Sequence, residues 1–168
     1  FVDGGITDNM GLRAFVDVVA ASGGPQELMK KLQRKIPKHI VFLTVNASTE
    51  KHPDMNLSAK QPGILASMNA MTDIQLHRYN ASTIDQTRFL LKKWAADIST
   101  PETQVKSYFI EIGFTQVADP QLKYFLNKVP TTFSLTPEQV DALINSGKEI
   151  LLADPEFKQL LAELAANP

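Results

Sequence analysis

The chain has no cysteine, and this absence excludes disulfide bonds and thiolate metal sites without deciding the compartment. Charge of one sign is not in excess, because 17 Lys and Arg residues stand against 18 Asp and Glu residues, so no basic surface points to nucleic acid. No apolar run approaches the roughly 18 residues that a membrane-spanning helix needs. A length of 168 residues with 43% hydrophobic content fits one globular domain with a sizeable core.

An initiating methionine and a signal-peptide pattern are also absent, since the chain opens on Phe1 and Val2. These two residues are typical of a buried strand, which needs partner strands on both sides. We therefore expect the chain to be the C-terminal part of a longer protein, with a sheet that is incomplete here. An incomplete sheet leaves a strand edge exposed, which favours a dimer or an exchange of strands.

The residues after this opening show a helix pattern and then a strand pattern. Apolar residues recur with helical spacing over residues 12–20, and a basic helical stretch is expected at residues 27–34. Residues 39–45 form a short apolar run rich in β-branched residues, which predicts a strand covered on both faces. A strand, a helix and a second strand in this order favour a βαβ unit.

The middle of the chain is predicted to contain a pair of helices and one more strand. Residues 46–63 are polar and interrupted by proline, which predicts a loop. One helix is expected from residue 64 to about residue 80, and a second over residues 84–98. A partly exposed strand is expected next, at residues 105–112.

The last third is predicted to be helical, because three dipeptides each place a capping residue before a proline. These dipeptides are Asp119-Pro120, Thr136-Pro137 and Asp154-Pro155. The sequence thus predicts an α/β fold, with residues 1–115 as the α/β part and residues 116–168 as a helical C-terminal segment.

Asp3 is the strongest candidate for a catalytic side chain. It comes at the end of the opening strand, and Gly4 and Gly5 after it permit a tight turn and the close approach of another loop. A carboxylate on a rigid strand end can act as the base for a hydroxyl nucleophile that comes within about 2.6–3.2 Å. The alternative is a plain turn, in which Asp3 only bonds neighbouring amides or caps the next helix.

The longer string Asp-Gly-Gly-Ile-Thr-Asp-Asn, with Gly-Leu-Arg and an amphipathic helix behind it, resembles the Asp-Gly-Gly motif of patatin-like phospholipases. The stretches at residues 61–80 and 130–140 are similar to later regions of bacterial members, so the resemblance covers essentially the whole chain. It implies a three-layer α/β/α domain in which Asp3 is the aspartate of a Ser-Asp dyad. It further implies that Gly4 and Gly5 form the turn presenting Asp3, and that Asn9 caps the helix or braces the loop. Many members have proline where this chain has Gly11.

The nucleophile of that family lies in a Gly-x-Ser-x-Gly elbow, and this chain contains no such elbow and no Gly-rich oxyanion loop before it. Ser22 lacks the first glycine of the elbow, and Ser67 falls within a helix pattern. We therefore expect the serine to come from an N-terminal remainder of the same protein, and we expect the chain alone to be inactive.

Other candidate sites are weaker. His39, His52 and His77 show no metal-ligand spacing, and the loop with Asp3 and Asp8 lacks the alternating oxygen ligands of a calcium site, so no metal is expected. One Met-rich apolar set is interpreted either as core or as a lipid-facing surface beside an acyl-chain pocket. Its members include Met55, Leu57, Ile64, Leu65 and Met68, with Met71 beside them.

The resemblance implies hydrolysis of a phospholipid or another acyl-ester lipid, with no cofactor and with peripheral contact to a membrane surface. It favours a bacterial protein of the cell envelope or a secreted one over a cytoplasmic one. The competing hypothesis is a non-catalytic helical domain for interaction or membrane association, in which Asp3 only completes a turn.

Overall fold

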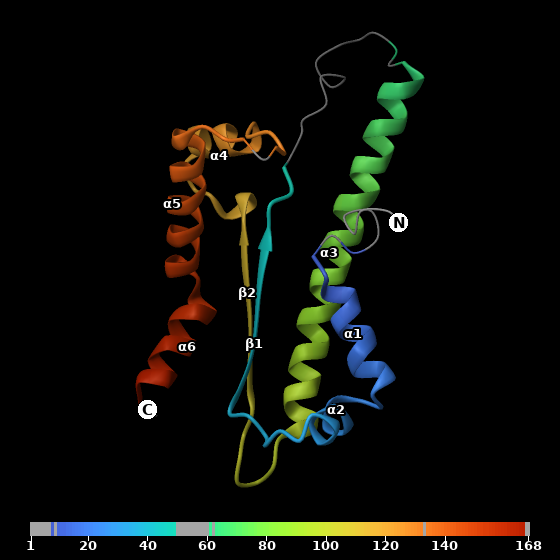
Figure 1. The fold of residues 1–168 in the computed structure, drawn as a ribbon, viewed down its shortest axis with the longest axis vertical. Helices are drawn as coiled ribbons and strands as arrows, with labels where there is room; N and C mark the ends of the chain where they lie inside the picture. Colours follow the sequence, from blue (N-terminus) through green and yellow to red (C-terminus); the bar gives the residue numbers. More distant parts are fainter. Residues whose placement is uncertain (1–7, 9, 50–60, 62, 133, 167–168) are drawn as a thin grey trace. The chain divides into compact units, whose positions relative to one another are not determined.

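The computed structural model describes residues 8, 10–49, 61, 63–132 and 134–166, and this part of the chain is a mixed α/β structure that is mostly helical. It contains six α-helices and two parallel strands (Figure 1). The chain divides into two compact units, Phe1–Ile40 with His52–Ser107, and Val41–Lys51 with Tyr108–Pro168. The expected opening strand at Phe1 and Val2 lies outside the described residues.

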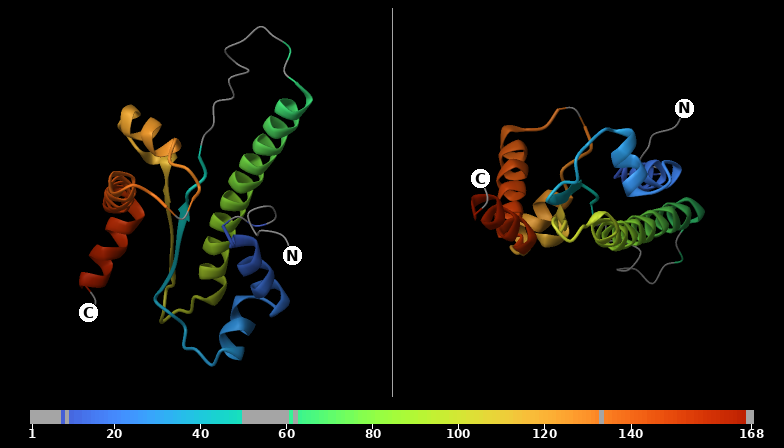
Figure 2. Two further views of the ribbon diagram at one scale, coloured as in Figure 1. Left: turned by 45° about the horizontal axis from the view of Figure 1, so that its top comes forward. Right: turned by 90° about the horizontal axis from the view of Figure 1, so that it is seen from below.

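The first unit is built on three helices: α1 (Leu12–Ala21), α2 (Pro25–Lys31) and α3 (Ile64–Ile98). Figure 2 shows α1 and α2 beside the C-terminal half of α3. The ring of Phe15 meets Trp94 edge to face, with 5.7 Å between the ring centroids. The Gln26 side-chain amide donates a hydrogen bond to the Asp97 carbonyl oxygen at 2.5 Å. The buried apolar residues of this unit are Leu12, Val19, Leu91, Trp94, Ala95, Ile98 and Val105.

The predicted pair of helices is wrong, because residues 64–98 form one continuous helix of 35 residues, about 50 Å long at 1.5 Å per residue. The sequence predicts a break where the apolar spacing gives way to polar residues. Instead Asn80, Thr83 and Thr87 are buried on the helix, and the Thr87 hydroxyl donates to the Thr83 carbonyl oxygen at 2.7 Å. Because a threonine hydroxyl can bond within its own helix, Thr87 is accommodated without ending it.

The second unit holds most of both strands, β1 (His39–Asn46) and β2 (Lys106–Gly113), and the C-terminal helices. A 3-10 helix, η3 (Phe114–Gln116), leads from β2 to α4 (Pro120–Asn127), and α5 (Pro137–Ala153) and α6 (Pro155–Ala166) come after it. Tyr108, Ile110 and Leu160 form its buried cluster, against which Leu151 and Phe157 pack.

The three predicted helix starts in this unit are confirmed. Asp119 Oδ1 accepts hydrogen bonds from the first turn of α4, and Asp154 Oδ1 accepts one from Phe157 N at 2.8 Å. Thr136 and Gln139 form the reciprocal capping box at the start of α5. Each cap satisfies backbone N–H groups that a helix start otherwise leaves without acceptors.

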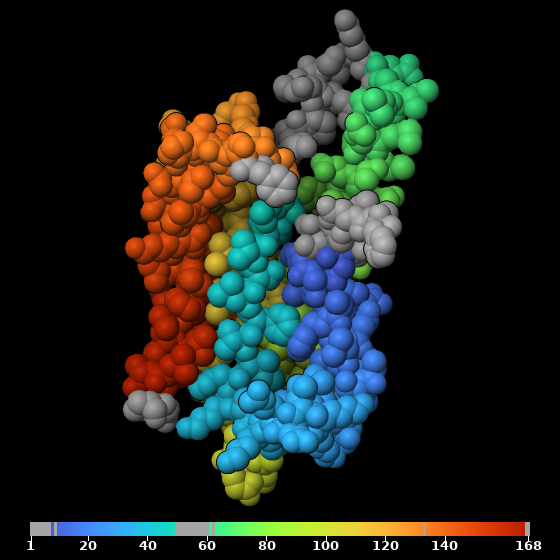
Figure 3. Space-filling view, in the orientation of Figure 1, coloured from blue at the N-terminus to red at the C-terminus, as the bar shows by residue number. Residues whose placement is uncertain are grey.

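The prediction that residues 39–45 form a strand covered on both faces is right about the strand and wrong about its cover. Val41, Leu43 and Val45 are exposed, Val45 to 64%, whereas Thr44 is buried. Side chains alternate between the two faces of a strand, so only the face with Phe42 and Thr44 is packed. On that face Phe42 stacks on Phe109 of β2, with 6.3 Å between the centroids. β1 is visible at the surface in Figure 3.

Candidate functional site

The residues that the sequence predicts for catalysis are not among those that the structure describes. Asp3, Gly4, Gly5 and Asn9 all lie outside the described residues. Their predicted roles therefore stay predictions. The structure does describe Asp8, which belongs to the same motif, and the start of α1.

Asp8 anchors the start of α1. Its Oδ2 accepts a hydrogen bond from Ala14 N at 2.9 Å and its Oδ1 accepts one from Arg13 N at 3.3 Å. Its own carbonyl oxygen accepts from Gly11 N at 3.0 Å, which closes a turn before the helix. The carboxylate also lies at the positive end of the helix dipole. Asp8 thus has a structural role that the motif alone did not predict.

Gly11 sets the direction in which the chain joins α1. Its φ of +67° lies in the left-handed region, which favours glycine. A proline at this position would be fixed near −65° and would have no N–H to bond the Asp8 carbonyl oxygen. The path into α1 seen here is therefore closed to proline.

The first three turns of α3 carry an exposed apolar stripe, and we define the α3 stripe as Ile64, Leu65, Met68, Met71 and Ile74. All five are more than half exposed, Leu65 to 72%. Their spacing places them on one side of the helix, and this end of α3 is green in Figure 3. The interpretation of the Met-rich set as part of a buried core is therefore wrong for its four members in the stripe, Ile64, Leu65, Met68 and Met71. Its interpretation as a lipid-facing surface stays a prediction. Met55 and Leu57 lie outside the described residues.

The helix predicted from residue 64 to about residue 80 would place His77 near its end, but α3 continues to Ile98, so His77 lies within the helix. Its Nε2 lies 3.9 Å from Asp73 Oδ1, one turn earlier on the same exposed helix. Ser67 is exposed within α3, and Ser22 comes after the last residue of α1. Neither serine occupies a strand-to-helix elbow in this structure.

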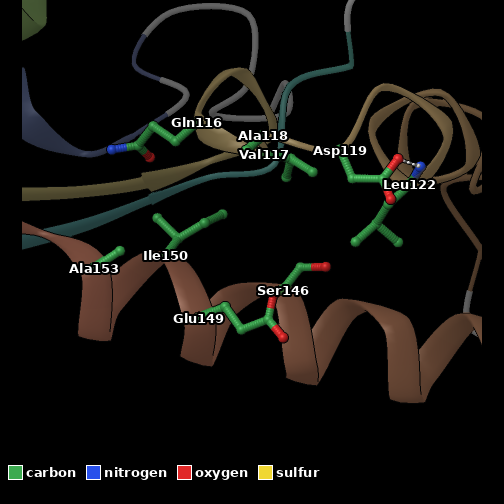
Figure 4. A pocket seen from close by; sticks show the side chains of 9 residues that line it. All are labelled: Gln116, Val117, Ala118, Asp119, Leu122, Ser146, Glu149, Ile150 and Ala153. Carbon is green, nitrogen blue, oxygen red and sulfur yellow. Dashed lines mark hydrogen bonds between the residues drawn. The ribbon is translucent and has the colours of Figure 1, made fainter.

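A cavity of about 300 Å³ in the second unit was not predicted from the sequence. It lies between α5 and the segment that joins η3 to α4 (Figure 4). It is lined by Gln116, Val117, Ala118, Asp119, Leu122, Ser146, Glu149, Ile150 and Ala153. The four α5 residues in this set have the spacing i, i+3, i+4 and i+7 of one helix face. That spacing is visible in the sequence, but the segment that faces it is not.

Among the described residues, no group of three His, Asp or Glu side chains is placed to hold a metal ion. Within the same residues, none of the helices is long and apolar enough to cross a membrane.

The chain matches no family model and no curated protein, and its structure matches no solved structure.

Proposed function

We propose that this chain is the C-terminal part of a patatin-like lipid acyl hydrolase, and that it contributes the aspartate of a Ser-Asp dyad. The observation that carries the proposal is the string of residues 3–9, Asp-Gly-Gly-Ile-Thr-Asp-Asn, directly before an amphipathic helix. The order of α1 and α2 before β1, and the parallel pairing of β1 with β2, are compatible with one part of a three-layer α/β/α domain.

In the proposed mechanism a serine of the N-terminal remainder attacks the carbonyl carbon of the lipid ester. Asp3 accepts the proton of the serine hydroxyl and passes it to the leaving alkoxide, so the alcohol departs and an acyl-serine remains. The deprotonated Asp3 then takes a proton from a water molecule, which attacks the acyl-serine, and returns that proton to the serine oxygen as the fatty acid is released. Gly4 and Gly5 form the turn that brings Asp3 to the serine, and no cofactor takes part.

The α3 stripe is the surface that we assign to lipid contact, together with Met55 and Leu57. It presents flexible methionine and aliphatic side chains that can adapt to acyl chains. The protein would bind peripherally to a membrane surface and take up a phospholipid or another acyl-ester lipid there.

The proposal is tested by labelling the intact protein with a fluorophosphonate, which reacts with an activated serine. We expect one labelled serine, within a Gly-x-Ser-x-Gly elbow on the N-terminal side of Phe1. The 168-residue chain alone should neither be labelled nor hydrolyse a p-nitrophenyl acyl ester. Turnover by that chain would show that its own residues supply the nucleophile.

A second candidate function is a non-catalytic helical domain that associates with a membrane or another protein. The specific observation in its favour is the α3 stripe, which is exposed on a chain that is mostly helical. Fluorophosphonate labelling separates the two functions, because only the hydrolase requires a reactive serine in the intact protein.

A further inference from the structure

The cavity between α5 and the residues before α4 combines apolar walls with a buried hydroxyl group. Figure 4 shows the side chains of Val117 and Leu122 pointing toward α5, with Ser146 and Ile150 pointing toward them. Its apolar side chains are Val117, Ala118, Leu122, Ile150 and Ala153. The volume of about 300 Å³ lies at the small end of the range for ligand sites, which suits a compact organic molecule.

Ser146 is the feature that points to a ligand. The residue is 4% exposed, and its Oγ has no hydrogen-bond partner among the residues that the structure describes. A serine in a helix usually bonds the carbonyl oxygen four residues earlier, and a buried hydroxyl without a partner is unfavourable. The hydroxyl can both donate and accept, so a polar group of a bound molecule would complete it.

The charges at the cavity select the sign of that polar group. Two lining residues are acids, Asp119 and Glu149, and none of the described residues that line the cavity is a lysine or an arginine. Asp119 Oδ1 accepts from Gln121 N at 2.7 Å and from Leu122 N at 3.2 Å, which fixes this carboxylate at the start of α4. Glu149 is exposed on α5, one turn after Ser146. A carboxylate ligand would be repelled here, and an ammonium group would be attracted.

We propose that this cavity binds a small primary amine with an apolar body, an alkylammonium or arylalkylammonium ion. The ammonium group donates hydrogen bonds to the Glu149 carboxylate and to Ser146 Oγ, with Asp119 adding to the negative potential. The hydrocarbon part packs against Ile150, Leu122 and Val117. This site is independent of the proposed lipid hydrolysis, and it disfavours the fatty acid that such a reaction would release.

The test compares three probes that share a six-carbon chain and differ in charge: hexylammonium, 1-hexanol and hexanoate. Each is titrated into the full 168-residue chain at neutral pH and monitored by the NMR amide shifts of α4 and α5. We expect saturable binding of hexylammonium, weaker binding of hexanol and none of hexanoate. Added salt should weaken the binding of hexylammonium more than that of hexanol.

Three variants locate the binding. Ser146→Ala should weaken the binding of hexylammonium by about threefold to tenfold, the usual effect of losing one hydrogen bond. It should leave the melting temperature unchanged or higher, because it removes a buried hydroxyl without a partner. Glu149→Gln should weaken the binding of hexylammonium by about threefold to fivefold, as for the loss of an exposed ion pair, and leave the binding of hexanol unchanged. Asp141→Asn, an exposed acid of α5 away from the cavity, is the matched control and should change nothing.

The proposal is overturned if hexanoate binds as well as hexylammonium, or if hexylammonium causes no saturable shifts in α4 and α5. It is also overturned if Ser146→Ala and Glu149→Gln both bind hexylammonium as the unmodified chain does.

Discussion

Replacing Glu156 by alanine should destabilise the protein more than its position on the surface of a helix suggests. Glu156 Oε2 accepts a hydrogen bond from Phe109 N at 2.6 Å, which joins the first turn of α6 to β2. Phe109 is 3% exposed, so its N–H would lose this acceptor where water does not reach it, at a cost of about 1–3 kcal/mol. Loss of a carboxylate from the first helical turn adds about 0.3–1 kcal/mol. A total of about 2.5 kcal/mol corresponds to a fall in melting temperature of about 5–10 °C for a chain of this length.

Thermal unfolding monitored by circular dichroism measures this fall, and hydrogen exchange of the Phe109 amide localises it. Glu156→Gln keeps an acceptor oxygen on a side chain of the same length, so it should lose about 1 kcal/mol or less. Glu138→Ala removes a glutamate from the first turn of α5, where only the dipole interaction is at stake. Melting of Glu156→Ala within 1 °C of the unmodified chain, or no lower than that of Glu138→Ala, would refute this role of Glu156.

Three further predictions concern single positions. Gly11→Ala should lower the free energy of unfolding, measured in urea, by about 1–2 kcal/mol. A Cβ at this position meets no atom within 4 Å, so only the left-handed φ is unfavourable. Gly11→Pro should lower the free energy of unfolding by more. Burial, and then the nearby Glu163, raise the pKa of Tyr108 from 10.0 to about 12. The contribution of Tyr108 to the free energy of unfolding should therefore be constant below pH 10 and be lost as the pH rises toward 12. The phenolate absorbance lost in Tyr108→Phe reports this pKa, which Glu163→Gln should lower. If the proposed function holds, Leu65→Asp should weaken lipid hydrolysis by the intact protein without lowering its melting temperature, since Leu65 is exposed. Ala66→Asp, on the other side of α3, is its control.

Local signals predicted the C-terminal helices well, because their starts depend on residues next to one another. Asp119, Thr136 and Asp154 each bond amides two or three residues ahead, a contact that the sequence spacing alone determines. The continuity of α3 was not predictable in the same way. Whether polar residues end a helix depends on whether their side chains find partners within it, as Thr87 does with Thr83.

Exposure was the property that the sequence predicted least well. The run at residues 39–45 is apolar on both faces of β1, yet Val41, Leu43 and Val45 are exposed. The α3 stripe is likewise spaced as a buried helix face would be. In both elements the sequence pattern shows which face is apolar, whereas the burial of that face depends on segments that are distant in the sequence.

The candidate sites differ in what the sequence could say about them. Asp3 was predicted from a motif, and its role stays a prediction. The role of Asp8 depends on the positive φ of Gly11, which bends the chain so that the carboxylate reaches the amides of Arg13 and Ala14. The cavity at Ser146 depends on a tertiary contact between α5 and the residues before α4, which no local pattern contains.

The most direct test of the proposed function is lipid hydrolysis by the intact protein with Asp3→Asn. Asp8→Asn is the matched control, because it alters an acid of the same motif that has no part in the proposed reaction and keeps one of the two oxygens that accept from the amides of Arg13 and Ala14. The proposal predicts that Asp3→Asn abolishes turnover while the melting temperature is kept, and that Asp8→Asn stays active. Full activity in Asp3→Asn would contradict the assignment of Asp3 as the base of the dyad.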